Sequence, residues 1–89
     1  MLTYANQDFD EQQRILSRLE NDMAYRTELL RHPDSQVRCW TDWTLEYFGL
    51  RTMRPVTDRN RQHATTALIN LWRALTACEN RHADMACFE

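Results

Sequence analysis

The chain has 89 residues, of which 43% are hydrophobic and 27% are charged, with one glycine and two prolines. This length excludes a multidomain enzyme, and the scarcity of glycine and proline excludes collagenous and low-complexity classes and disfavours a turn-rich sandwich or barrel. The formal charge of −2 and the pI near 5.9 argue against a protein that mainly coats nucleic acid. The composition therefore predicts a single small all-α domain over residues 1–89.

The first predicted helix covers residues 8–31. Its apolar residues recur at heptad spacing along one face, at Phe9, Leu16, Met23 and Leu30. This spacing predicts one uninterrupted helix whose apolar face is buried in the domain or paired with a second copy of the chain, as a homodimer. Pro33 ends the helix because proline restricts the residue before it and cannot donate a backbone hydrogen bond.

The second predicted helix covers residues 35–48, with Asp34 or Ser35 as its N-cap. The single glycine of the chain, Gly49, follows this helix and is itself followed by Leu50. This pair predicts a C-terminal cap in which the glycine takes a positive φ and the leucine folds back onto the last turn. The helix carries several large side chains: Val37, Trp40, Trp43, Tyr47 and Phe48.

The third predicted helix covers residues 58–80, after Thr57 as its N-cap. Its apolar residues recur at helical spacing: Ala64, Leu68, Leu71, Trp72, Leu75 and Cys78. The weak periodicity of residues 81–89 predicts a tail that frays or docks. Three helices joined by short connections predict a three-helix bundle built on an αα-hairpin.

The segment LLRHPDSQVR, residues 29–38, is followed by Trp40, Leu45, Phe48 and Gly49 and resembles one unit of a HEAT-like helical repeat of the phycobilisome-lyase type. In that family a leucine-rich helix ends in a proline-containing turn, and an acidic-polar-Val-Arg start opens the next helix. With the later alanine and leucine series, the resemblance covers residues 29–75. It implies HEAT-like packing and a protein-binding scaffold, and it brings no catalytic residues. Where the family has small alanines, this chain has Trp40 and Trp43.

The tripeptide His32-Pro33-Asp34 has both a functional and a structural interpretation. It matches the tripeptide with which J-domain co-chaperones stimulate their chaperone partner, and it lies in a connection between helices as it does there. The lysine-rich helix and the longer loop of a J-domain are absent from this chain. A helix stop followed by a helix cap is therefore the favoured interpretation.

Cys78, His82 and Cys87 lie close together in the sequence, and thiolate and imidazole groups at short spacing are typical zinc ligands. A fourth ligand is missing locally, and a cysteine is often only a small buried hydrophobe. We therefore assign no metal site, and a zinc-stabilised helical domain stays an alternative.

Positive charge and aromatic side chains concentrate around the end of the second predicted helix. Two arginines there fall in the first turn of the next helix, where the helix dipole disfavours cations unless an anion of the same chain or of a partner compensates. Exposed tryptophan beside arginine is typical of interaction hot spots. His63 adds to the same basic region. The predicted partner-binding residues are Trp40, Trp43, Tyr47, Arg51, Arg54, Arg59 and Arg61.

The sequence contains no nucleophile with a base and an orienting group, and no phosphate-binding glycine loop, so we expect no enzymatic activity and no cofactor. It instead predicts a small protein-interaction module that docks on an acidic protein surface, an adaptor or inhibitor of the kind that mobile elements and phages encode. A nucleic-acid-binding regulator that uses residues 51–61 is the alternative. Three cysteines, an odd number, and no apolar leader favour a reducing cytoplasm, and no apolar run approaches the roughly 18 residues of a membrane span.

Overall fold

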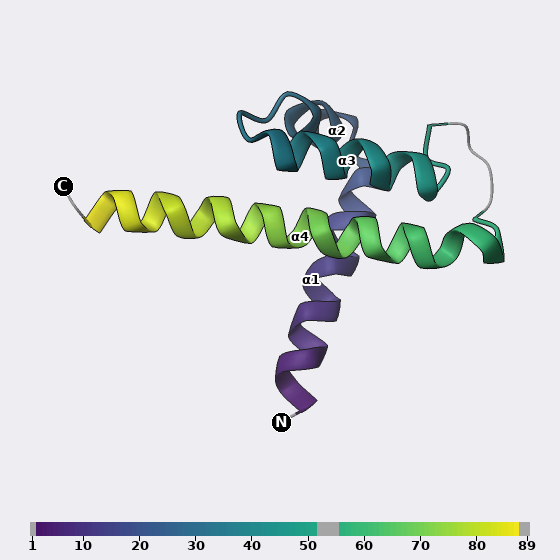
Figure 1. Ribbon diagram of the computed structural model, residues 1–89, viewed down its shortest axis with the longest axis horizontal. Helices are drawn as coiled ribbons and strands as arrows, with labels where there is room; N and C mark the ends of the chain where they lie inside the picture. The colour runs from purple at the N-terminus through teal and green to yellow at the C-terminus, as the bar shows by residue number, and fades with distance from the viewer. Residues whose placement is uncertain (1, 52–55, 88–89) are drawn as a thin grey trace.

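The computed structural model describes the backbone of residues 2–51 and 56–87 and the side chains of residues 8–51 and 56–80. Within these ranges the regular secondary structure is entirely helical: α1 (Leu2–Asn21), α2 (Met23–Leu30), α3 (Ser35–Tyr47) and α4 (Asp58–Cys87). The predicted all-α class is confirmed, with four helices described where three were predicted. Helices α3 and α4 lie side by side as a hairpin, and α1 crosses α4 at a steep angle (Figure 1).

The first predicted helix, over residues 8–31, is interrupted at Asp22, and this prediction of one continuous helix is wrong. Asp22 has an extended backbone, with φ −127° and ψ 100°, and its Oδ1 accepts a hydrogen bond from the Tyr25 N–H at 3.1 Å as the N-cap of α2. Arg26 Nε donates to the Leu19 carbonyl at the end of α1. Aspartate side chains compete in this way with a continuing helix, so the chain changes direction.

The interruption also divides the predicted heptad stripe. Phe9 and Met23 are 58% and 66% exposed, whereas Leu19 is buried and Leu16 is half-buried. The two halves of the stripe belong to helices that point in different directions, so they do not form one face. The expectation of one continuous apolar face along residues 8–31 is therefore wrong.

The core lies where the four helices meet. Its buried hydrophobic cluster draws on every helix: Leu19, Tyr25, Leu29, Val37, Leu45, Leu71 and Cys78. The most extensive packing is between α3 and α4. Small side chains are buried on both of these helices, at Thr41 and Thr44 and at Ala64 and Ala67, as close packing of two helices requires.

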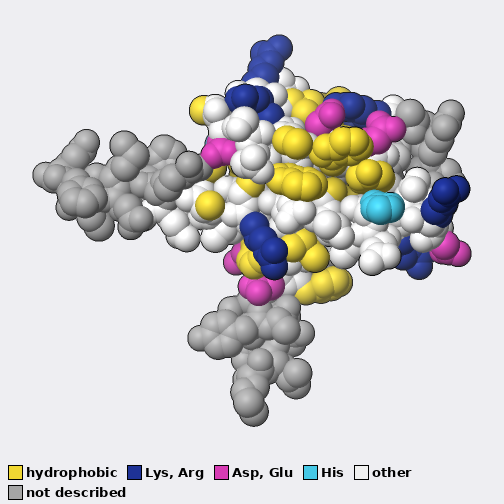
Figure 2. Space-filling model, viewed as in Figure 1, with side chains coloured by type: hydrophobic (Ala, Val, Ile, Leu, Met, Phe, Trp, Pro, Cys, Tyr) yellow, Lys and Arg dark blue, Asp and Glu magenta, His cyan; other side chains and the backbone are white. Residues whose placement is uncertain are grey.

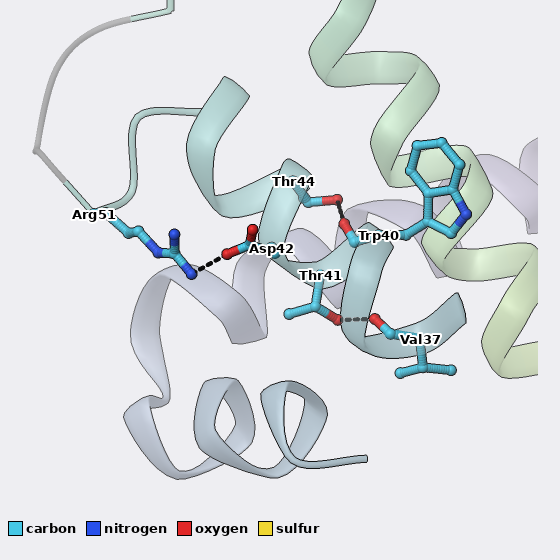
Figure 3. A network of polar contacts seen from close by, with 6 residues as sticks. All are labelled: Val37, Trp40, Thr41, Asp42, Thr44 and Arg51. Atoms are coloured by element: carbon cyan, nitrogen blue, oxygen red, sulfur yellow. Dashed lines mark hydrogen bonds and ion pairs between the residues drawn. The ribbon is translucent and has the colours of Figure 1, made fainter. Parts of the chain in front are cut away.

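The hydroxyl groups of the two buried threonines of α3 are both hydrogen-bonded to backbone carbonyls of the same helix. Thr41 Oγ1 donates to the Val37 carbonyl at 2.7 Å, and Thr44 Oγ1 donates to the Trp40 carbonyl at 2.6 Å (Figure 3). Among the described side chains, no buried polar atom lacks a hydrogen-bond partner. The polar side chains at the centre of the hairpin therefore carry no desolvation penalty for an unmade hydrogen bond.

The connection between α2 and α3 is the predicted helix stop and cap. Asp34 Oδ1 accepts from the backbone N–H groups of Gln36 at 2.8 Å and Val37 at 3.3 Å, which identifies Asp34 as the N-cap of α3. His32 Nδ1 accepts from the Asp34 N–H at 3.0 Å. The tripeptide is thus held by local hydrogen bonds that start the next helix.

The end of α3 confirms the predicted glycine cap. Gly49 has a φ of 66°, its N–H donates to the Glu46 carbonyl at 3.1 Å, and the Leu50 N–H donates to the Leu45 carbonyl at 2.9 Å. This pair of bonds is the Schellman motif, and Leu50 packs against the core as that motif predicts. The left-handed backbone at this position is the reason that a glycine is needed there.

Thr57 caps the start of α4 as predicted, because its Oγ1 accepts from the Asn60 N–H at 3.2 Å. The helix continues to Cys87, seven residues past the predicted end at residue 80. No glycine or proline occurs between Asn80 and Cys87 to stop it, so residues 81–87 belong to α4 and not to the predicted tail. None of the described helices combines the length and the apolar character that crossing a membrane requires.

Candidate functional site

Three rings stack in a row across α3 and α4, near the loop that joins these helices. The ring centroids of Trp43 and Tyr47 are 5.4 Å apart with planes 18° apart, and those of Tyr47 and His63 are 5.5 Å apart with planes 25° apart. We call Trp43, Tyr47 and His63 the aromatic ladder. Stacking at these separations is favourable beyond the burial of ring surface. The stacking therefore restricts the orientation of each ring.

Both ends of the aromatic ladder are exposed to solvent. Trp43 is 43% exposed, His63 is exposed and Tyr47 is half-buried. Figure 2 shows hydrophobic side chains gathered along the line between α3 and α4. Covering an exposed aromatic ring is favourable in free energy, because its apolar surface then leaves water. Trp43 is therefore accessible to solvent, and its role in partner binding stays a prediction.

Trp40 differs from Trp43, although it lies only one turn earlier on α3. It is half-buried, packs against the core cluster and donates from Nε1 to Gln36 Oε1 at 3.2 Å. Figure 3 shows the ring directed toward α4. Trp40 therefore supports the hairpin, and only part of its surface is accessible beside the aromatic ladder.

The arginines of the predicted surface have different surroundings. Arg51 forms an ion pair with Asp42 on α3 (Figure 3). Arg61 Nη2 lies 3.4 Å from Asp58 Oδ1 in the first turn of α4. The anion that Arg61 needs at this helix start is thus supplied by the chain itself. Arg59 is exposed. Arg54 lies outside the described residues.

The structure places His63 at the α4 end of the aromatic ladder, stacked on Tyr47. The sequence indicates that His63 belongs to a basic region but not that its ring stacks on another ring. Positions 47 and 63 belong to different helices, so the spacing along the chain gives no signal that their rings stack. The ladder as a unit is therefore a feature of the tertiary structure.

A pocket of about 530 Å³ lies between α1, α2 and α4 and was not predicted from the sequence. Two contacts organise it: the Arg18 guanidinium carbon lies 3.7 Å from the centroid of the Tyr25 ring, and Trp72 Nε1 donates to Glu11 Oε2 at 2.7 Å. These contacts engage the Arg18 guanidinium, one face of the Tyr25 ring, the Trp72 N–H and the Glu11 carboxylate with one another. The pocket is lined by Glu11, Arg14, Ile15, Arg18, Tyr25, Glu28, Leu29, His32, Trp72, Leu75, Thr76, Cys78 and Glu79.

Of the three residues considered for zinc, only Cys78 has a described side chain. It is buried in the core cluster, whereas the side chains of His82 and Cys87 lie outside the described ones. Among the described side chains, no group of three or more His, Cys, Asp and Glu residues could hold a metal ion. The zinc-stabilised alternative therefore stays a prediction, and metal analysis of the purified protein is its direct test.

We expect the stability of the protein to depend on pH through Tyr25, which lines this pocket. Burial raises the pKa of the Tyr25 hydroxyl above its ordinary value of 10.0, Arg18 opposes this shift, and Glu28 and Glu79 add to it. Above about pH 10 the unfolded chain loses this proton first, so the folded protein binds more protons and the free energy of unfolding falls as pH rises. Urea unfolding from about pH 8 to 11 measures this decline. We expect it to be shallower in Tyr25→Phe, and an equally steep decline in that variant would contradict the assignment.

Comparisons with protein-family models, with curated proteins and with solved structures found no match to this chain.

Proposed function

We propose that the chain is a small non-catalytic protein-interaction module, an adaptor or inhibitor, that docks on another protein through the aromatic ladder and the arginines beside it. The observation that supports this proposal is Trp43, which is 43% exposed while its ring is held by stacking on Tyr47. A ring that is already oriented loses little conformational freedom on binding, so more of the free energy of its burial contributes to affinity. Tryptophan and arginine are also the residue types most enriched at interaction hot spots.

The charges beside the ladder favour a partner with an acidic surface. Arg59 is exposed, and within the described residues no carboxylate pairs with it. The ion pairs of Arg51 and Arg61 lie at the surface, where such pairs contribute little and can exchange for carboxylates of a partner. Positive groups around an aromatic centre would steer an acidic surface toward it. The HEAT-like resemblance of residues 29–75 implies a protein-binding scaffold as well and belongs to this proposal.

Two variants that each change an exposed apolar side chain test the docking surface. The protein is used to capture partners from its native cells, and the captured partner is then titrated by calorimetry with Trp43→Ala and, as the control, Met23→Ala, which changes an exposed side chain on α2. We expect Trp43→Ala to weaken binding at least about tenfold, which corresponds to about 1.4 kcal/mol, and Met23→Ala to leave it unchanged. A partner that binds Trp43→Ala as tightly as the wild-type protein would refute this surface.

The same ladder supports a second candidate function, a regulator that binds single-stranded nucleic acid. Stacked aromatic rings beside arginines are also the means by which proteins hold unpaired bases. Fluorescence anisotropy with a labelled single-stranded oligonucleotide at about 50 and 200 mM salt separates the two functions, because phosphate contacts make affinity fall steeply with salt. Binding that is steeply salt-dependent and lost in Trp43→Ala would favour the nucleic acid. Absence of binding at both salt concentrations would favour the protein partner.

A further inference from the structure

The pocket between α1, α2 and α4 has an apolar floor and a charged rim. Its volume of about 530 Å³ lies in the range of small-molecule sites. The floor includes buried and half-buried side chains: Ile15, Tyr25, Leu29, Trp72, Leu75 and Cys78. The rim carries the exposed charged side chains: Glu11, Arg14, Arg18, Glu28 and Glu79. A cavity of this composition suits a ligand with an apolar body and one charged end.

The Tyr25 hydroxyl is a polar group of this floor that is left for a ligand. Tyr25 is only 8% exposed, and within the described residues its hydroxyl forms no hydrogen bond. No fully buried polar atom of the described side chains lacks a partner, so this hydroxyl is not sealed inside the protein. It therefore reaches the solvent of the pocket that Tyr25 lines. A phenol hydroxyl both donates and accepts, and both functions are available here.

Two carboxylates from different helices lie near this hydroxyl. Burial is the main cause of the raised pKa of Tyr25, and Glu28 of α2 and Glu79 of α4 add to it, so both charges act at the hydroxyl. Within the described residues neither carboxylate forms an ion pair. Arg18 opposes their effect, but its guanidinium lies over the Tyr25 ring, 3.7 Å from the ring centroid. Two such carboxylates beside an available hydroxyl oxygen offer an ammonium group three acceptors.

The formal charge of the lining also favours a cation. The pocket is lined by three carboxylates and two guanidinium groups, which sum to a charge of −1. His32 Nδ1 accepts from the Asp34 N–H at 3.0 Å, as a neutral imidazole does, so His32 adds no charge. One of the three carboxylates, that of Glu11, already accepts from Trp72 Nε1. A ligand with a single positive charge would neutralise the pocket.

We propose that this pocket binds a small aromatic amine, whose ammonium group lies between Glu28 and Glu79 and donates to the Tyr25 hydroxyl. The ring of the ligand lies on Trp72 and on the aliphatic side chains of the floor. An ammonium ion alone would leave most of the apolar floor in water, so the ligand needs an apolar body. Aromatic side chains in the floor favour a flat ring as that body. This site is separate from the docking surface on α3 and α4.

Tryptamine is the probe for this site, and NMR of the isotope-labelled full chain is the readout. Trp72 lines the pocket and Trp43 does not, so their indole N–H signals report on the pocket and on the docking surface separately. We expect tryptamine to shift the Trp72 signal with a dissociation constant of about 1 mM or less, and to leave the Trp43 signal in place. The variant Trp72→Phe, which lacks this indole, assigns the signal.

Two analogues with the same ring test the charge of the ligand. Tryptophol has a hydroxyl in place of the ammonium group, and indolepropionate has a carboxylate. We expect tryptophol to bind at least about tenfold more weakly than tryptamine, because it lacks the charge-assisted hydrogen bonds. Indolepropionate is expected to bind more weakly still, since Glu28 and Glu79 repel its carboxylate.

A pair of double variants tests the two carboxylates. Glu28→Gln with Glu79→Gln is expected to weaken tryptamine binding at least about tenfold and to leave tryptophol binding unchanged. The control is Glu20→Gln with Glu46→Gln, which removes the same formal charge at exposed positions that do not line the pocket. We expect the control to bind tryptamine like the wild-type chain. All four side chains are exposed, so both variants should keep the helical circular dichroism spectrum.

Three results would overturn the proposal. These are a Trp72 signal that does not move in up to about 10 mM tryptamine, an uncharged or anionic analogue that binds as tightly as tryptamine, and a chain with both Glu28→Gln and Glu79→Gln that binds tryptamine like the wild type. The pocket and the docking surface share no side chain, so Trp43→Ala is expected to bind tryptamine normally. Failure of one proposal therefore leaves the other testable.

Discussion

Replacing Leu71 by alanine is expected to lower the free energy of unfolding by about 2–5 kcal/mol. Leu71 has 0% exposure at the centre of α4, where it belongs to the cluster that draws on all four helices. The substitution removes buried methyl groups and leaves a cavity, and a core supplied by so few residues has little else to fill the space. Urea unfolding followed by circular dichroism measures the loss.

Leu75→Ala is the matched control, because it makes the same chemical change one turn further along α4 at a half-buried side chain. We expect a smaller loss there, since less apolar surface returns to water and solvent can enter the space. A loss at Leu71 no greater than that at Leu75 would contradict the description of the core as the junction of four helices.

Replacing Arg26 by alanine is expected to destabilise the fold by about 1.5–3 kcal/mol, the usual range for a hydrogen bond from a charged group. Arg26 Nε donates to the Leu19 carbonyl at the end of α1, and Arg26 Nη1 lies 3.4 Å from the Leu50 carbonyl, beyond the end of α3. One half-buried guanidinium thus joins three segments around the turn at Asp22. Its removal leaves both carbonyl groups without this donor.

A thermal melt measures the effect of Arg26→Ala, and a loss of this size corresponds to a fall in melting temperature of roughly 10 °C in a domain of this length. Arg26→Lys should lose nearly as much, because a lysine ammonium cannot form the two separated bonds of a guanidinium fork. Arg73→Ala, at an exposed position of α4, controls for the loss of an arginine from a helix. Equal melting temperatures for the Arg26 and Arg73 variants would show that the junction does not depend on these bonds.

The helix ends that follow from local chemistry could be predicted from the sequence. Asp34, Gly49 and Thr57 act as predicted, because a cap depends on the residue itself and on neighbours within one turn. The break at Asp22 uses the same chemistry and was nevertheless missed. An aspartate inside a long apolar repeat is more often a solvent-facing residue than a cap, and the repeat alone favoured a continuous helix.

The candidate site was predicted only in part. Trp43 and Arg59 are exposed as a binding surface requires, but the similar sequence surroundings of Trp40 gave no sign that its ring packs against the core. The stacking of His63 on Tyr47 joins residues of two helices. Such contacts depend on how the helices are rotated about their axes, which periodicity indicates only to within a broad face.

The sequence by itself determined that this chain is helical, where most of its helices begin and end, and that Leu68 and Leu71 are apolar positions suited to a core. These properties arise from interactions within one or two turns of a helix. Only the tertiary structure decided the direction of α1, the aromatic ladder and the exposure of Phe9. These features depend on contacts between segments distant in the sequence, and the turn at Asp22, stabilised by Arg26, determines which of those segments meet.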